Sequence, residues 1–324
     1  MKRILHVAAI ALTALLYAPL AAMAQAYPSK TVRVVIPWPP GGSNDIVGRI
    51  VLQKMGEAMG QQFVVDNRPG AAGSIGADVV AKAPPDGYTL MVHSTTHLGN
   101  AFIYGKKLGY DTMKDFTGVG LLSAQPGVLT VHPSLPVKST KEFLALARSR
   151  PGQILYSSSG NGSAPHLQMA LLVSMAKLNL VHVPYKGGAP QVTALVSGET
   201  QVSFATIGTV INFIHQGKLR PLGVGTAKRV NALPDVPTIS ESGVPGYEMT
   251  PWVGMFAPAG TPKAIIDRLN AEVNKALKKP DIMDKLQKQG LDPWTSTPEE
   301  FDARLKADYE KYGRLIKLTG AKIE

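Results

Sequence analysis

The sequence predicts an α/β fold built on mostly parallel β-sheets. From about residue 30 to residue 95, short apolar segments of strand length alternate with longer amphipathic segments of helix length, and the alternation returns after residue 150. Strands connected through helices form parallel sheets, because each helix carries the chain back along the sheet. In the first part we expect strands at 31–36, 62–66 and 89–93, with helices at 44–59 and 73–82.

The first 26 residues resemble a secretory signal peptide. Lys2 and Arg3 precede an apolar stretch, and small residues offer cleavage after Ala24 or Ala26. An uncleaved membrane anchor is the alternative, but Pro19 interrupts the stretch and no cluster of charges follows it. We therefore expect residues 1–26 to be removed and the mature chain to be exported.

The charge of the mature chain favours small anions as partners. The chain has 34 Lys and Arg against 23 Asp and Glu, and removing Lys2 and Arg3 leaves 32 against 23, a net charge of +9. No aromatic residues alternate with the basic ones as stacking on bases requires, so we expect no nucleic-acid partner. The chain has no cysteine, which excludes disulfides and thiolate metal sites.

A glycine-containing turn follows the first predicted strand. Residues 39–45, the first turn, read Pro-Pro-Gly-Gly-Ser-Asn-Asp. The prolines end the strand, the glycines permit a tight turn, and Ser43 or Asn44 can cap the next helix. Free amide groups and the helix dipole would then favour an anion, such as a carboxylate, above the turn. An ordinary strand-to-helix turn is the alternative. The candidate residues are Gly41, Gly42, Ser43 and Asp45.

Hydroxyl groups follow the third predicted strand. Loops beyond the carboxyl ends of parallel strands line the ligand crevice, so Ser94, Thr95, Thr96 and His97 should lie at the same sheet edge as the first turn. We interpret them as donors to a ligand. His93 and His97 are four residues apart, but that spacing suits a metal on a helix, whereas the chain up to His93 is predicted strand. We expect no metal site.

A second turn of the same kind lies in the middle of the chain. Strands predicted at 119–122 and 128–131 are separated by a Pro-Gly segment, which we interpret as the crossing into a second domain. After a strand at 154–156, residues 157–163, the second turn, read Ser-Ser-Ser-Gly-Asn-Gly-Ser. This turn offers amides and hydroxyls to an anion, although a flexible polar loop is the alternative. The candidates are Ser159, Gly160 and Ser163.

Two further strand ends complete the predicted site. A strand at 179–183 leads into Tyr185, Lys186 and Gly187, which supply an aromatic face, a cation and a turn. The cation either pairs with a ligand charge or is simply solvated. A strand at 201–205 ends in Ala205 and Thr206.

The rest of the chain is predicted to be structural. Residues 227–249 are rich in proline and glycine, as a return connection between domains would be. Capping-box patterns at Ser139 and Thr297 predict helix starts, and the helices near the carboxyl end carry charges of both signs, as solvated faces do.

No motif for catalysis or for a cofactor is present. The sequence lacks the nucleophile elbow, the zinc-protease pattern, the phosphate-binding loop and the dinucleotide fingerprint. A Ser-His-Asp triad is not excluded, because its members are distant in the chain. A secreted hydrolase acting on a small ester or amide therefore stays as the alternative to a binding protein, and we expect no enzyme and no cofactor.

Several motifs together resemble one family. They are Val-Ile-Pro-x-x-Pro-Gly-Gly-x-x-Asp-x-x-x-Arg at 35–49, Asn-Arg-Pro-Gly-Ala-Ala-Gly at 67–73, Pro-Asp-Gly-Tyr-Thr-Leu at 85–90, His-Val-Pro-Tyr-Lys-Gly-Gly at 182–188 and Leu-Pro-Asp-Val-Pro-Thr at 233–238. In this order they resemble the Bug family, the TctC-like extracytoplasmic solute receptors of tripartite tricarboxylate transporters.

The resemblance implies a two-lobed periplasmic binding protein fold, type II-like, that closes like a Venus flytrap. Each lobe would be a mostly parallel sheet flanked by helices, with the ligand cleft between the lobes. We expect the first domain to comprise 27–125 and 248–324, and the second to comprise 126–247. The resemblance also implies a periplasmic monomer that delivers its ligand to the membrane permease of the transporter.

The resemblance further implies which loops face the ligand, namely 41–45, 94–97, 159–163, 184–187 and 205–206. Relatives hold a carboxylate through backbone amides and water, which need not be weak. Many relatives are similar in having Asp where this chain has Ala205. Without that carboxylate, an amino acid is a less suitable ligand than a di- or tricarboxylate or an aromatic carboxylate.

Overall fold

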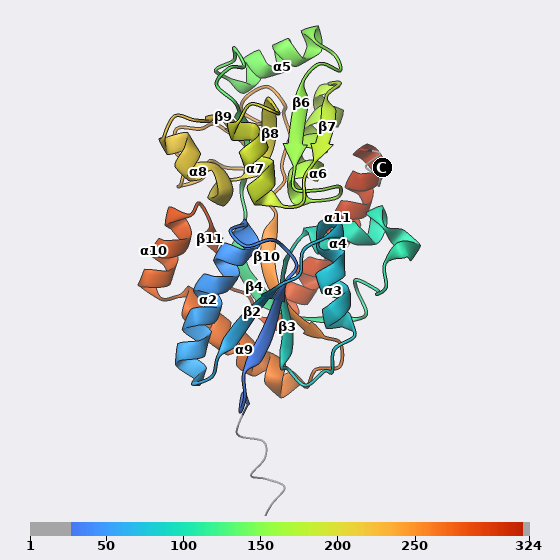
Figure 1. The fold of residues 1–324 in the computed structure, drawn as a ribbon, viewed down its shortest axis with the longest axis vertical. Coiled ribbons are helices and arrows are strands. Elements are labelled where there is room, and N and C mark those ends of the chain that lie inside the picture. Colours follow the sequence, from blue (N-terminus) through green and yellow to red (C-terminus); the bar gives the residue numbers. More distant parts are fainter. Residues whose placement is uncertain (1–26, 320–324) are drawn as a thin grey trace, which may run out of the picture.

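The computed structural model describes residues 27–319, and the predicted signal peptide lies outside them. These residues form two β-sheets, each with its own set of helices (Figure 1). The first sheet has six strands in the order β11-β4-β10-β3-β1-β2. Its strands are β1 (Val32–Ile36), β2 (Phe63–Asn67), β3 (Thr89–Ser94), β4 (Phe116–Ala124), β10 (Trp252–Pro258) and β11 (Asp292–Pro293).

The first sheet is mixed. Strand β1 pairs in parallel with β2 and β3, whereas β10 runs antiparallel to both β3 and β4. The prediction of a mostly parallel sheet is therefore wrong outside β1, β2 and β3, the part to which the alternation of strands and helices applies. Strand β10 follows lobe 2 in the chain, so no helical crossover joins it directly to β3 or β4. It can therefore lie antiparallel to both.

The second sheet has five strands in the order β7-β6-β8-β5-β9. Strand β6 is parallel to β7 and β8, and β5 is antiparallel to β8 and β9. The strands are β5 (Gly127–Val131), β6 (Leu155–Ser158), β7 (Val181–Pro184), β8 (Val202–Thr206) and β9 (Arg220–Val224). We call the six-stranded sheet with its helices lobe 1, and the five-stranded sheet with its helices lobe 2.

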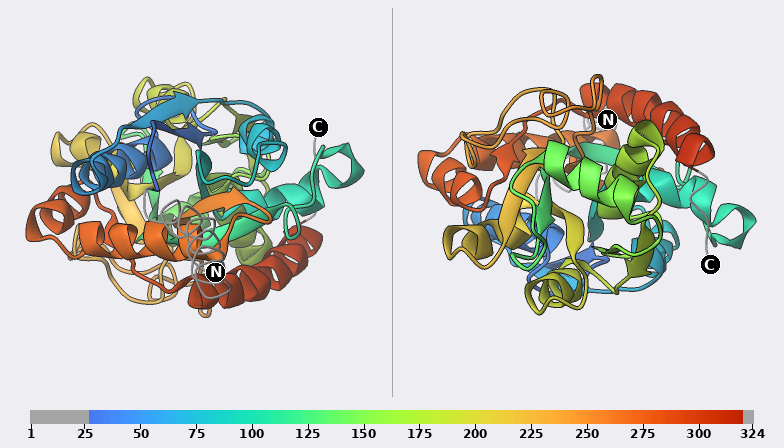
Figure 2. Two further views of the ribbon diagram at one scale, coloured as in Figure 1. Left: turned by 90° about the horizontal axis from the view of Figure 1, so that it is seen from below. Right: turned by 90° about the horizontal axis from the view of Figure 1, so that it is seen from above.

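Helices cover both sheets. Lobe 1 carries α2 (Ser43–Met59), the 3-10 turn η2 (Ala71–Gly73), α3 (Ser74–Ala81), α4 (Thr96–Ile103), the 3-10 turn η3 (Gly105–Lys107), α9 (Lys263–Leu277), α10 (Pro280–Lys288) and α11 (Pro298–Thr319). Lobe 2 carries α5 (Thr140–Ser149), α6 (Ala164–Ala176), α7 (Gly188–Val196) and α8 (Ile207–His215). Seen along the long axis, α9 and α11 lie on the opposite side of the molecule from β1 and β2 (Figure 2). Among the residues described, no helix combines the length and apolar character needed to span a bilayer.

Both predicted capping boxes are confirmed. Ser139 Oγ accepts the amide of Glu142, and the Glu142 carboxylate accepts the amide of Lys138 at 2.7 Å, which starts α5. Before α11 the pair is fully reciprocal, because Thr297 Oγ1 accepts the amide of Glu300 and the Glu300 carboxylate accepts the amide of Thr297. Such boxes satisfy amides that have no partner inside the helix, so they set where each helix begins.

Two chain segments connect the lobes. The amide of Gln125, between β4 and β5, donates to the carbonyl of Pro251 at 2.8 Å. This bond places the return segment beside the outward one, and the amide of Met249 in the return segment donates to the carbonyl of Gly225, just after β9, at 2.8 Å. The lobes also pack on each other away from these segments, because Leu167 of α6 is in one apolar cluster with Leu98 of α4. The exact domain boundaries at 126 and 248 stay a prediction.

Candidate functional site

A small cavity lies between the two lobes, and we call it the main cavity. Its volume, measured as space for the centres of water-sized spheres, is about 40 Å³. That is room for roughly three or four such spheres. Its walls are formed by Trp38, Gly42, Ser43, Asn44, Ser94, Thr96, Gln125, Ser159, Ala164, Pro165, Gly188, Gln191, Thr206 and Thr209.

Five helices begin at the main cavity. Helices α2 and α4 reach it from lobe 1, and α6, α7 and α8 reach it from lobe 2. The first turn of a helix has amide groups without intrahelical partners and carries the positive end of the helix dipole. None of the described residues that line the cavity has a charged side chain. The cavity is therefore electropositive through its backbone, a chemistry that suits a small anion.

The first turn is held by a buried carboxylate. Asp45 is 3% exposed, and its carboxylate accepts hydrogen bonds from the Gly41 amide, from Arg49 Nε and from Asn67 Nδ2, each at 3.0 Å. Burial by itself raises the pKa of Asp45, but the hydrogen bonds from Arg49, Gly41 and Asn67 outweigh it and lower the pKa below its usual value. The carboxylate is therefore charged at neutral pH and holds the turn in place.

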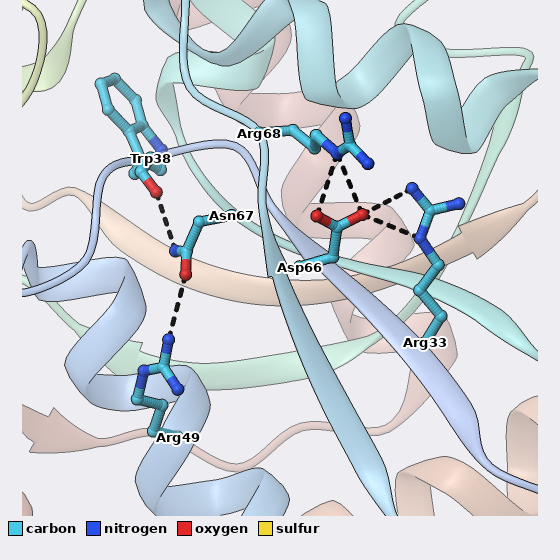
Figure 3. Close-up of polar contacts among 6 residues, drawn as sticks. All are labelled: Arg33, Trp38, Arg49, Asp66, Asn67 and Arg68. Atoms are coloured by element: carbon cyan, nitrogen blue, oxygen red, sulfur yellow. Dashed lines mark hydrogen bonds and ion pairs between the residues drawn. The ribbon is translucent and has the colours of Figure 1, made fainter.

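Asn67, at the end of β2, connects this carboxylate to Trp38. Its Nδ2 donates to the Trp38 carbonyl at 2.9 Å, and its Oδ1 accepts from Arg49 at 3.0 Å (Figure 3). Beside it, Asp66 accepts from Arg33 Nε and Arg68 Nε, both at 2.9 Å. The Asn-Arg motif at 67–68 thus orders the strand end next to the first turn.

Two of the four candidates from the first turn do not line either cavity described here. Gly42 and Ser43 line the main cavity, whereas Gly41 is exposed and Asp45 faces its own hydrogen-bond partners. The expectation that Asp45 faces the ligand is therefore corrected, since all its neighbours stabilise a carboxylate that shapes the turn. Gly41 has φ of +80°, a conformation that glycine adopts without strain.

The hydroxyls after β3 join the lobes. Ser94 and Thr96 line the main cavity, and Ser94 Oγ donates to Thr96 Oγ1 at 3.2 Å. Thr96 Oγ1 also accepts the amide of Ala164 at 3.2 Å, a hydrogen bond from lobe 2 to lobe 1. Thr95 is 1% exposed and is not among the cavity residues.

His97 lies away from the cavity. His97 was predicted in a loop, but it lies in α4, which starts at Thr96. Its ring packs against Phe116 and Phe256 with centroid distances of 4.6 and 5.3 Å. Burial in this apolar setting lowers its pKa to about 3. The expectation that His97 contacts the ligand is corrected, because the helix turns its side chain into the core.

The second turn is held by neutral groups. Ser163 caps α6 and is fully buried, so it shapes the turn and does not line the cavity. The Gly162 amide donates to His166 Nδ1 at 3.0 Å, and Ser158 Oγ accepts the Gly160 amide at 3.2 Å. Of the three predicted residues, Ser159 lines the main cavity.

Two stacked histidines support the second turn. The rings of His166 and His182 have centroids 4.2 Å apart and planes 2° apart, and His182 Nε2 lies 2.6 Å from Ser158 Oγ. Burial lowers the pKa of His166 to about 4, and burial together with the neighbouring His166 lowers the pKa of His182 to about 3. Both rings are therefore neutral at neutral pH.

A second cavity lies beside the main one along the seam between the lobes. Its volume on the same measure is about 180 Å³. It shares Trp38 and Ser159 with the main cavity, and it includes four other residues that the sequence predicted, Gly160, Tyr185, Lys186 and Gly187. Its walls are Trp38, Pro39, Pro69, Gly70, Ala71, Ala72, Tyr104, Ser159, Gly160, Asn161, Pro184, Tyr185, Lys186 and Gly187.

The last two predicted positions divide between cavity and core. Thr206 is the residue immediately before α8 and lines the main cavity. Ala205 is 1% exposed, pairs with Val128 of β5, and packs in the apolar core of lobe 2. The expectation that Ala205 faces the ligand is corrected, because side chains alternate along a strand and the cavity lies at its end.

Sequence reasoning missed the amide side chains at the cavity. Gln125 Nε2 donates to Asn44 Oδ1 at 2.9 Å, and Gln191 Nε2 donates to Ser203 Oγ at 2.6 Å, with all four groups buried. Gln125 lies in the predicted crossing segment, where a buried polar residue could have been suspected. No pattern in the sequence singles out Gln191, which lies one turn inside α7.

Two buried polar atoms of the main cavity have no partner within the described chain. They are Trp38 Nε1 and Ser43 Oγ. A buried donor without a partner costs about 1–3 kcal/mol, so such atoms point to a ligand or water in the cavity. Within residues 27–319, no group of three or more His, Asp and Glu side chains is placed to hold a metal ion.

Comparison with known proteins agrees with this geometry. The family model described as "Tripartite tricarboxylate transporter family receptor" matches residues 47–321. Protein BugT of Bordetella pertussis is 32% identical over 326 residues, which cover 100% of this chain and 99% of BugT. Solved structures are also similar over nearly the whole chain, and two of them are described with a bound acid.

The first of these structures is Rpa4515 of R. palustris with adipate. It is 35% identical with a TM-score of 0.89, and the match covers 92% of this chain and 100% of that one. The second is MatC from Rhodopseudomonas palustris with bound malate, 32% identical with a TM-score of 0.84, covering 90% of this chain and 100% of that one. The predicted two-lobed periplasmic binding protein fold is confirmed. The chain therefore belongs to the tripartite tricarboxylate transporter receptors, the Bug or TctC-like family that its motifs resemble.

Proposed function

We propose that this protein is an extracytoplasmic receptor that captures a small carboxylate between its two lobes. The observation that carries the proposal is the main cavity, where five helices from both lobes begin and where no charged side chain lines the wall. The solved relatives with adipate and malate support a carboxylate as the ligand class. We infer that the contacting residues are those of the cavity wall, with Gly42, Ser43 and Thr206 among them.

The site binds a small anion without a counter-charge. Each charge-assisted hydrogen bond contributes about 1.5–3 kcal/mol, so three or four of them reach micromolar affinity after the cost of ordering and closure. A neutral wall also leaves the bound carboxylate free to leave when the lobes open, because no ion pair has to be broken.

Ligand capture would favour the closed arrangement. The cavity wall comes from both lobes, so a ligand in it contacts both only when they are together. The direct bond between Thr96 and Ala164 and the close approach of Gly187 to Pro39 already join the lobes around it. A Cβ atom at Gly187 would lie 2.8 Å from Pro39 Cδ. The closed receptor then delivers its ligand to the permease of a tripartite tricarboxylate transporter in the membrane.

Binding without chemistry fits this wall better than hydrolysis. The serine and threonine hydroxyls of the main cavity have no histidine or carboxylate beside them in the wall. A hydrolase needs a base within hydrogen-bond reach of its nucleophile. We therefore propose that the protein is not an enzyme and that it acts as a monomer in the periplasm.

Replacing Gly42 tests the site. A Cβ atom at Gly42 would meet only the Pro39 carbonyl, at 3.5 Å, and Gly42 has an ordinary φ of −75°, so the fold accommodates a side chain. Gly42→Leu places that side chain at the main cavity, and we expect at least a hundredfold loss of carboxylate affinity with an unchanged melting temperature. Calorimetric titration with C4 to C6 dicarboxylates measures it. Unchanged affinity for every acid that wild type binds would remove the main cavity as the site.

A further inference from the structure

The second cavity offers what the main cavity lacks, namely length and charge. The main cavity has room for about a carboxylate and one neighbouring carbon, whereas the second cavity measures 180 Å³ against 40 Å³. A longer acid that places one carboxylate at the helix starts must therefore extend beyond the main cavity. Trp38 and Ser159 line both cavities, so the two cavities adjoin at these residues.

The walls of the second cavity match the far end of a linear acid. Pro39, Pro69 and Pro184, with the ring of Tyr104, present apolar surface suited to methylene groups. Lys186 is the one charged residue among the described residues of this wall, and it makes no ion pair with any carboxylate of the described chain. The hydroxyl of Tyr185 is already bonded to Glu199 at 2.7 Å, so among the described residues of this wall Lys186 is the cation available to an anion.

We propose that the second cavity is an extension subsite that receives the distal end of a linear dicarboxylate, with Lys186 selecting a distal carboxylate. This inference rests on the proposed function, because it takes the first carboxylate to be held in the main cavity. Trp38 Nε1 is buried and has no partner within the described chain, and Trp38 lines both cavities. It is therefore a donor available to a ligand that occupies the two cavities together. The substrate class is thus an α,ω-dicarboxylate longer than the main cavity can hold.

The first arm of the test compares acids of equal length. Adipate and hexanoate share six carbons and differ in the distal carboxylate, and calorimetric titration of the mature full chain gives their affinity ratio. Because Lys186 is exposed, we expect Lys186→Met to reduce the preference for adipate about two- to fivefold. Lys218→Met, which removes another exposed lysine away from both cavities, should leave the ratio unchanged. Identical ratios in the two variants would overturn the role of Lys186.

The second arm changes the space and keeps the charge. Asn161 lines the second cavity and not the main one, so Asn161→Phe should weaken adipate at least tenfold and leave propanoate within about twofold of wild type. Equal effects on the two acids, or none on either, would overturn the extension subsite. If wild type binds none of these acids, the proposed carboxylate site itself fails. If wild type binds them and Asn161→Phe does not weaken adipate selectively, the extension subsite alone fails.

Discussion

The two turns that line the main cavity are both held in shape by side-chain hydrogen bonds, but charged groups hold the first turn and neutral groups hold the second. In the first turn, residues 39–45, the backbone is held by the charged carboxylate of Asp45 with Arg49 and Asn67. In the second turn, residues 157–163, it is held by neutral imidazole and hydroxyl groups of His166 and Ser158. In both turns the shaping groups lie behind the backbone, and the cavity itself receives amides and hydroxyls.

The difference follows from where each turn lies. The side chain of Arg49 is 51% exposed, so the first turn can keep a charged pair partly in water. His166 is 6% exposed and lies under the second turn, where a charge would have to be desolvated. A neutral ring that accepts a hydrogen bond avoids that cost, but it makes the second turn sensitive to acid.

The largest expected effect comes from removing the charge that holds the first turn. Asp45→Ala leaves the Gly41 amide and the Arg49 guanidinium without their acceptor, and we expect a loss of about 2–3 kcal/mol in the free energy of unfolding. Carboxylate affinity should fall at least tenfold, since the turn loses its shape. Urea unfolding and calorimetric titration measure the two quantities.

Asp66→Ala is the matched control for this change. Its partners Arg33 and Arg68 are about half exposed, at 42% and 54%, and neither touches the first turn. We expect a stability loss below about 1 kcal/mol and normal ligand affinity. Equal losses of affinity in the Asp45 and Asp66 variants would show that local charge, and not the turn, is what matters.

The pH dependence of stability should separate the turns. With the pKa of His166 lowered from 6.5 to about 4, the unfolded chain takes up a proton that the folded chain does not as pH falls from about 6.5 toward 4. Stability supported by the second turn is therefore full above pH 6.5 and is lost across that window. The lowered pKa of Asp45 starts from 3.8, so the contribution of the first turn is lost only below that pH.

His166→Gln keeps a hydrogen-bond acceptor and removes the titration. We expect the variant to lose about 2 kcal/mol less free energy of unfolding than wild type between pH 7 and pH 5. Urea unfolding at pH 7, 6 and 5 gives both curves. Parallel curves for wild type and variant would rule out His166 as the acid-sensitive group of the second turn.

The smallest expected effect is the loss of one neutral hydroxyl. Ser158→Ala removes the acceptor of the Gly160 amide and the neighbour of His182, and we expect about 1 kcal/mol lower stability and about threefold weaker carboxylate binding. Ser149→Ala removes a similar bond, from Ser149 Oγ to the Leu146 carbonyl at the exposed end of α5, and serves as the control. A variant of Ser158 that behaves like the Ser149 control would mean that the second turn does not need this hydroxyl.

Much of the site could be predicted because it is local. The first turn, the second turn and the strand end at Thr206 are each defined by a few consecutive residues, and all three contribute to the main cavity wall. Six predicted residues lie in the predicted segments but line neither cavity, namely Gly41, Asp45, Thr95, His97, Ser163 and Ala205. A one-residue shift of a helix start or the alternation of a strand decides such orientations, and sequence patterns do not resolve either to one residue.

The α/β class and the helix starts with capping boxes could be predicted from the chain alone, because they depend on periodicity and on contacts within a few residues. The family followed from short motifs in a fixed order. Three features became visible only in the folded molecule: five helices begin at one cavity, Gln125 bonds to Asn44, and a second cavity opens beside Trp38. Those features join residues tens of positions apart in two lobes, and their placement depends on how the lobes pack, which no local pattern encodes.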